Sequence, residues 1–85
     1  MVRNPVVDGQ FYESDFSKLN FQIEESFKSK KGPGSLPVSR DEKKKIRGVI
    51  VPHAGYYFSG PCAAWAYKEI AETHFPKTYI LLGFS

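Results

Sequence analysis

The chain has 85 residues, enough for one small domain, and its 41% of hydrophobic residues indicates a globular rather than a disordered protein. Its net charge of +3 is too small to argue by itself for a nucleic-acid or membrane partner, and we expect neither. The single cysteine excludes an internal disulfide framework. The amino terminus lacks the apolar core of a secretory signal, and no apolar run reaches membrane-spanning length, so we expect a cytoplasmic protein.

The first segment, residues 1–14, shows no helical period. Turn signals occur at Asn4-Pro5 and at Asp8-Gly9. We therefore expect an irregular or extended arm that is anchored by its aromatic residues.

Residues 15–28 carry the pattern of an amphipathic helix. Asp15 is the expected N-cap, with Ser14 as the alternative. Apolar residues then recur at spacings of three and four, which places them on one helical face. These residues are Phe16, Leu19, Ile23 and Phe27.

Residues 29–45 form the expected basic loop. Glycines and prolines interrupt any regular element there, and eight of the 12 basic residues fall between Lys28 and Arg47. A surface for single-stranded nucleic acid would interleave such charge with aromatic residues, but this stretch has none. We therefore predict a solvated, flexible loop.

The sequence of the second half of the chain predicts a strand, a helix and a second strand. Residues 46–52 include three consecutive β-branched residues, typical of a strand covered on both faces. A helix over residues 60–73, capped by Ser59 or Gly60 and with Pro61 in its first turn, would follow. A second strand over residues 77–83 would then complete a βαβ unit with parallel strands. Two parallel strands leave unpaired edges, so the expected fold is α/β and part of a larger α/β domain.

The leading candidate for chemistry is His53, because it follows the first expected strand, where ligands bind in open parallel sheets. An imidazole can ligate a metal or act as a base, although it can also simply bond a backbone group in a turn. Tyr56 and Tyr57 would line the same cleft and contact the substrate. Cys62 falls in the first turn of the expected helix, and there a packed residue is favoured over a reactive thiol.

Several segments together resemble the Memo family, which is similar to class III non-haem-iron (extradiol) dioxygenases. They are the opening R-N-P-x-x-x-G-x-F-Y, then PHAGYYFSG, PCAAWAYKEI and LLGFS. The resemblance is to the amino-terminal part of that family. It implies an α/β fold and a site for iron or copper with two His ligands and one Cys. His53 matches the first ligand. The second belongs to an L-G-x-S-H motif that this sequence matches up to Ser85, and the Cys lies further downstream.

This resemblance suggests two kinds of function, one catalytic and one non-catalytic. The first is metal-dependent redox or oxygen chemistry in a strand-end cleft, with His53 as ligand and catalytic residue. The alternative is a non-catalytic module that holds a peptide or a small anion in the same cleft. Whether the protein is an enzyme stays open. With one of three ligands, the isolated chain is expected to bind metal weakly and to be inactive, and to need the remainder of the domain or a homo-oligomer partner.

Overall fold

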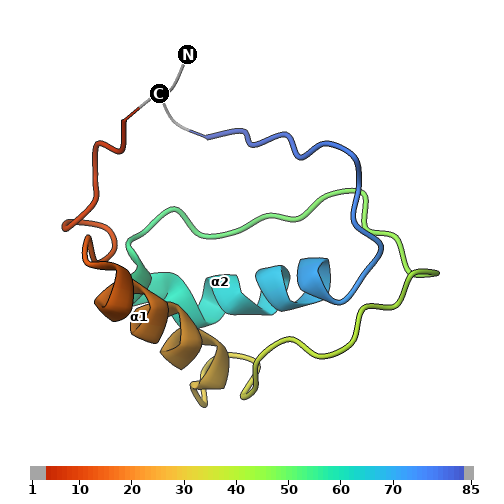
Figure 1. Ribbon diagram of the computed structural model, residues 1–85, viewed down its shortest axis with the longest axis horizontal. Coiled ribbons are helices and arrows are strands. Elements are labelled where there is room, and N and C mark those ends of the chain that lie inside the picture. The colour runs from red at the N-terminus through yellow and green to blue at the C-terminus, as the bar shows by residue number, and fades with distance from the viewer. Residues whose placement is uncertain (1–3, 84–85) are drawn as a thin grey trace.

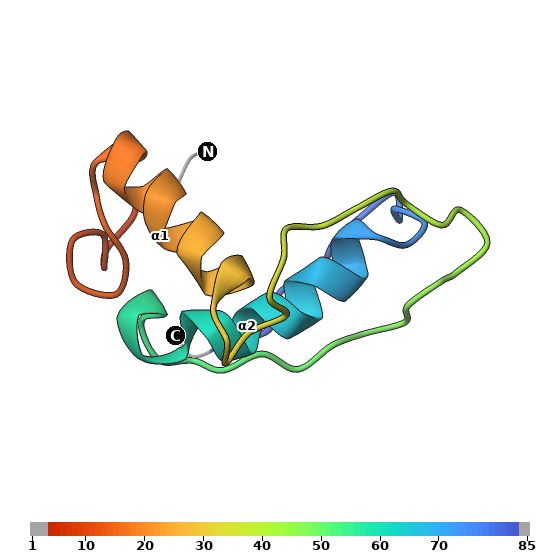
Figure 2. The same cartoon turned by 90° about the horizontal axis from the view of Figure 1, so that it is seen from below.

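Two helices are the regular elements of the computed structural model, which describes residues 4–83 (Figure 1). Helix α1 spans Phe16–Lys28 and helix α2 spans Tyr56–Ala71. Figure 2 shows α1 meeting the first half of α2. Neither helix in the described part of the chain is long and apolar enough to cross a membrane.

Helix α1 begins where its capping residue predicts. The carboxylate of Asp15 accepts a hydrogen bond from the Lys18 backbone N–H at 3.1 Å, which confirms Asp15 as the N-cap. The Ser29 N–H bonds to the Glu25 carbonyl at 2.9 Å and closes the last turn. Lys28 in this turn complements the negative end of the helix dipole.

Helix α2 starts at Tyr56, four residues before the expected position 60, and Gly55 is its N-cap. Ser59 or Gly60 was the expected cap, but both lie inside the helix, and the Ser59 hydroxyl donates back to the Ala54 carbonyl at 2.8 Å. Pro61 therefore lies within the helix and not at its first position. Its missing N–H leaves one carbonyl of the preceding turn without its usual helical donor.

The helices approach most closely where α2 carries small residues. Gly60 and Ala64 are the buried residues of α2, and Ala64 is only 2% exposed. A Cβ at Gly60 would overlap the Ser26 hydroxyl of α1, which would have to rotate away, so glycine favours this close crossing. The apolar core between the helices is consequently small.

The predicted βαβ unit is wrong, because residues 46–52 and 77–83 form no strand in the described structure. The bridges found within residues 4–83 are two isolated ones, at Asp8–Tyr12 and Asp41–Thr73. No backbone hydrogen bond joins either predicted strand to another described residue. A β-rich sequence forms a strand only when a neighbour completes the ladder, and a lone pair of strands is marginal. The described part of the chain is therefore helical and not α/β.

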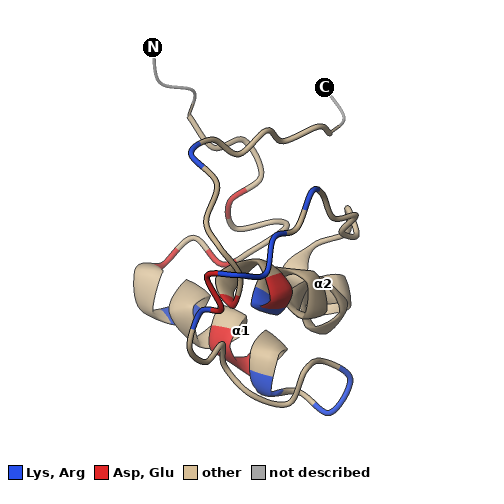
Figure 3. Cartoon of the chain, turned by 90° about the vertical axis from the view of Figure 1, so that its right-hand side faces the viewer, with Lys and Arg blue, Asp and Glu red and all other residues tan. Residues whose placement is uncertain are grey.

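Part of the basic loop lies along the end of α2. The Val38 N–H donates to the Glu72 carboxylate at 2.8 Å, and the Asp41 N–H donates to the Glu72 carbonyl at 2.8 Å. The Lys44 ammonium lies 2.8 Å from the Glu69 carboxylate, whose hydrogen bond and charge raise the pKa of this lysine. Figure 3 shows Lys, Arg, Asp and Glu on both helices and on this loop, with further charged residues on the neighbouring segments.

Candidate functional site

His53 lies on the turn that leads into α2, and this turn is held against the amino-terminal arm. The Tyr56 N–H donates to the Phe11 carbonyl at 2.7 Å. A Cβ at Gly55 would come within 2.8 Å of that same carbonyl oxygen, so this approach requires glycine. The Phe11 ring lies edge-on to the His53 imidazole, with 5.9 Å between centroids. His53 is thus an exposed imidazole in a turn fixed by a contact distant in sequence.

Tyr56 is the more enclosed of the two predicted substrate residues. Its side chain is 37% exposed, and its ring lies 5.5 Å from that of Tyr12. Burial raises the pKa of the Tyr56 phenol, with smaller contributions from Tyr67 and Tyr12. The phenol therefore remains protonated at neutral pH and can donate a hydrogen bond.

Tyr57 is the more exposed of the two, because successive residues on a helix diverge by about 100°. It is 84% exposed and meets Phe58 edge-on at 5.3 Å between ring centroids.

Two grooves flank α1 and α2. The larger, of about 630 Å³, is lined by polar residues of α1 together with both predicted tyrosines. Its lining includes Ser17, Lys18, Gln22, Glu25, Tyr56 and Tyr57. The second, of about 460 Å³, is mostly apolar and includes Ile23, Phe27, Tyr56, Tyr67, Ile70 and Phe75. The structure thus places both tyrosines on the larger groove, whereas His53 lines neither of these two grooves.

The residues that the structure describes do not make a complete metal site. Among residues 4–83, no group of three or more His, Cys, Asp or Glu side chains is arranged to hold a metal ion. His74 lies at the opposite end of α2 from His53 and is hydrogen-bonded to Glu42. Cys62 is an exposed free thiol on α2. His53 therefore belongs to no such group of three side chains among residues 4–83.

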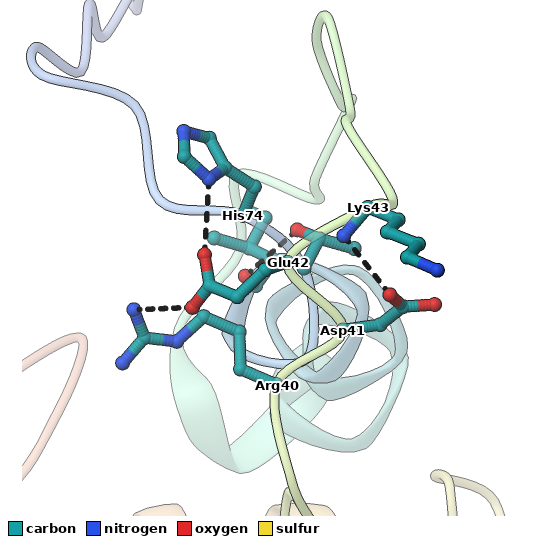
Figure 4. Close-up of polar contacts among 7 residues, drawn as sticks. Arg40, Asp41, Glu42, Lys43 and His74 are labelled. Atoms are coloured by element: carbon teal, nitrogen blue, oxygen red, sulfur yellow. Dashed lines mark hydrogen bonds and ion pairs between the residues drawn. The ribbon is translucent and has the colours of Figure 1, made fainter.

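A polar cluster that the sequence did not predict lies at the far end of α2 (Figure 4). The Glu42 carboxylate lies 3.0 Å from His74 Nδ1 and 3.3 Å from Arg40 Nη1. The Arg40 guanidinium also stacks over the Phe75 ring at 4.0 Å. No local pattern reveals this cluster, because Glu42 and His74 are 32 residues apart. It fastens the basic loop to the segment that follows α2.

The chain belongs to the Memo-like protein family, whose sequence model matches residues 3–85. It is 48% identical over 83 residues to the MEMO1 family protein MK0963 of Methanopyrus kandleri, covering 98% of this chain and 29% of the relative. It is 49% identical over 85 residues to the MEMO1 family protein SSO0066 of Saccharolobus solfataricus, covering 98% of this chain and 30% of the relative. The chain thus spans about 30% of the length of these curated relatives. No solved structure matches it.

Proposed function

We propose that this chain contributes His53 as one ligand of an iron or copper site in a Memo-like metalloprotein. Membership of the Memo-like family supports this proposal, because the segment Pro52-His53-Ala54-Gly55-Tyr56 carries the family resemblance at the expected ligand. The observation that carries it is the exposed imidazole in a turn fixed by the Phe11 carbonyl. A preformed position lowers the entropic cost of adding a ligand.

A complete site needs donors beyond the side chains that the structure describes, since residues 4–83 hold no group of three or more His, Cys, Asp or Glu side chains arranged for a metal ion. We therefore assign no reaction step to this chain. The redox or oxygen chemistry suggested by the resemblance is a proposal for a complete site. For the isolated chain we expect weak metal binding, because metal affinity depends on several convergent ligands.

The experiment uses the fact that the chain has only two histidines. We would titrate the chain with Cu²⁺ and follow the imidazole proton signals, which a paramagnetic ion broadens. His53→Ala should abolish the tighter binding event, and His74→Ala, the matched control, should leave it intact. Binding unchanged by His53→Ala, or lost equally in both variants, would contradict the proposal.

A second experiment supplies the rest of the proposed site. The chain would replace the matched segment of the Methanopyrus kandleri relative, and the metal content of the purified chimera would be measured. We expect bound metal in the chimera and its loss on His53→Ala. A chimera that retains its metal after this substitution would show that His53 is no ligand.

A non-catalytic binding function is the second candidate, and the larger groove favours it. This groove places the exposed Tyr57 beside Tyr56 and the cationic Lys18, groups suited to a short peptide. Glu25 on the same groove opposes a small anion, so a peptide is the better fit. Tyr57→Ala should weaken peptide binding without changing Cu²⁺ binding. Binding that depends on His53 instead would remove this candidate.

A further inference from the structure

The amino-terminal arm and the turn around His53 are far apart in the sequence and meet at Phe11. This residue makes two separate contacts with the turn. Its carbonyl accepts the hydrogen bond from the Tyr56 N–H at 2.7 Å. Its ring lies edge-on to the His53 imidazole, with 71° between the ring planes and 5.9 Å between the centroids. The carbonyl therefore fixes the backbone of the turn, whereas the ring acts on the imidazole itself.

The part of the arm that carries Phe11 is closed by its own backbone hydrogen bonds. The Val7 carbonyl accepts bonds from the N–H groups of Gln10 at 3.0 Å and Phe11 at 2.8 Å. The Tyr12 carbonyl accepts one from the Gly9 N–H at 2.7 Å. Gly9 has a φ of +80°, a conformation that residues with a side chain rarely adopt. In the opening G-x-F-Y, the glycine thus shapes a turn that gives the first aromatic residue a defined position.

Both helices hold this part of the arm in place. The Tyr12 ring lies 5.5 Å from the ring of Tyr56, the first residue of α2. The Glu13 N–H donates to the side-chain carbonyl of Gln22 on α1 at 3.0 Å. Phe11 itself is 37% exposed, so its surroundings cover most of it. The ring that meets the exposed His53 imidazole is therefore carried by a supported segment.

We infer that Phe11 is a positioning residue for His53, and that its ring holds the imidazole in the orientation in which His53 binds the metal ion. The inference rests on the proposed function for the role of His53 as a ligand. A surface side chain has three staggered orientations available at its first torsion. An edge-on aromatic pair favours the orientation that makes it by roughly 2- to 10-fold. Over three orientations, this bias raises the fraction of His53 in the favoured one by about 1.5- to 2.5-fold.

The test uses the 85-residue chain with His74→Ala, because His53 is then its only histidine. Phe11→Leu removes the ring and keeps the carbonyl that accepts from the Tyr56 N–H. In the metal-free chain, the Hα–Hβ coupling constants of His53 should move from values dominated by one orientation toward averaged values. The ring-current shift of the imidazole protons should disappear. Cu²⁺ should bind about 1.5- to 2.5-fold more weakly, because the apparent affinity falls with the fraction of the protein in the binding orientation.

Two further variants separate positioning from a general loss of structure. Tyr12→Leu is the matched control, because it removes the neighbouring ring contact of the same arm, which is with Tyr56 and not with His53. It should leave the His53 coupling constants and the Cu²⁺ affinity unchanged. Phe11→Tyr keeps a ring at position 11 and should retain the values of the unmodified arm. Amide exchange of Tyr56 reports whether the backbone contact persists in each variant.

Four results would overturn the inference. They are coupling constants unchanged by Phe11→Leu, an equal effect of Tyr12→Leu, tighter Cu²⁺ binding in Phe11→Leu, and imidazole protons without a ring-current shift when Phe11 is present. The last needs no variant that must fold. Cu²⁺ binding that is lost in His53→Ala but unchanged in Phe11→Leu would sink the positioning role and leave the proposed function standing. Cu²⁺ binding that is unchanged in His53→Ala would remove both.

Discussion

The contact between the amino-terminal arm and the start of α2 can be tested with one methyl group. In Gly55→Ala the new Cβ would lie 2.8 Å from the Phe11 carbonyl oxygen and 3.1 Å from its Cα. Both are backbone atoms, so the arm must move away. The φ angle of Gly55 is −60°, which alanine adopts freely, so the effect reports the contact and not backbone strain.

The expected magnitude follows from what the arm loses when it moves. The hydrogen bond from the Tyr56 N–H to the Phe11 carbonyl is worth about 1 kcal/mol. The ring contacts Phe11–His53 and Tyr12–Tyr56 contribute about 0.5–1.5 kcal/mol each. Alanine is also a poorer N-cap than glycine. We expect Gly55→Ala to lower the free energy of unfolding by roughly 2–3 kcal/mol.

Gly48→Ala is the matched control, because a Cβ at Gly48 would meet nothing within 4 Å. It should leave stability unchanged, or raise it by about 0.4–1 kcal/mol through the unfolded state. Urea unfolding followed by helical circular dichroism measures both variants, and amide exchange of Tyr56 reports the lost hydrogen bond directly. Equal stability of the two variants, with Tyr56 still protected, would refute the reasoning.

Two further predictions concern a cap and a carboxylate. Asp15→Ala should cost about 1 kcal/mol of stability in urea unfolding, because the Lys18 N–H loses its acceptor, whereas Ser14→Ala should cost little; equal losses would contradict the assigned cap. The pKa of Glu72 is lowered from 4.5, first by the hydrogen bond from the Lys68 ammonium and then by the Val38 N–H. A carboxyl group whose pKa is lowered in the folded state stabilises the fold at pH values above its unfolded-state pKa. This stabilisation is lost as the pH falls through the folded-state pKa. Glu72→Gln should therefore destabilise the chain more at pH 7 than at pH 3, and a pH-independent difference would refute this assignment.

The local predictions succeeded where neighbouring residues decide the outcome. Asp15 caps α1 through a backbone N–H three residues away, and this geometry can be read from spacing alone. The family resemblance of the PHAGYYFSG segment likewise depends only on the order of residues, and the family match over residues 3–85 confirms it. The roles assigned to His53, Tyr56 and Tyr57 stay predictions.

The strand predictions failed for a physical reason that is visible in residues 49–51. Consecutive β-branched side chains favour an extended backbone, but a strand exists only when another segment accepts its hydrogen bonds. No described residue does so, and the apolar side chains at Ile50 and Leu81 stay exposed. The start of α2 was misplaced because Ser59 and Pro61 mimic a cap and first turn, whereas Gly55 is selected by its contact with Phe11.

The sequence by itself determined the first helix with its cap, the family and the basic character of the loop. Only the tertiary structure decided that Gly55 packs on Phe11, that Glu42 pairs with His74, and that residues 46–52 and 77–83 form no sheet among the described residues. The first group depends on interactions within one or two helical turns. The second group depends on contacts between residues more than 30 positions apart. Bringing such segments together costs loop-closure entropy, and the contacts that offset this cost are not visible in a local sequence pattern.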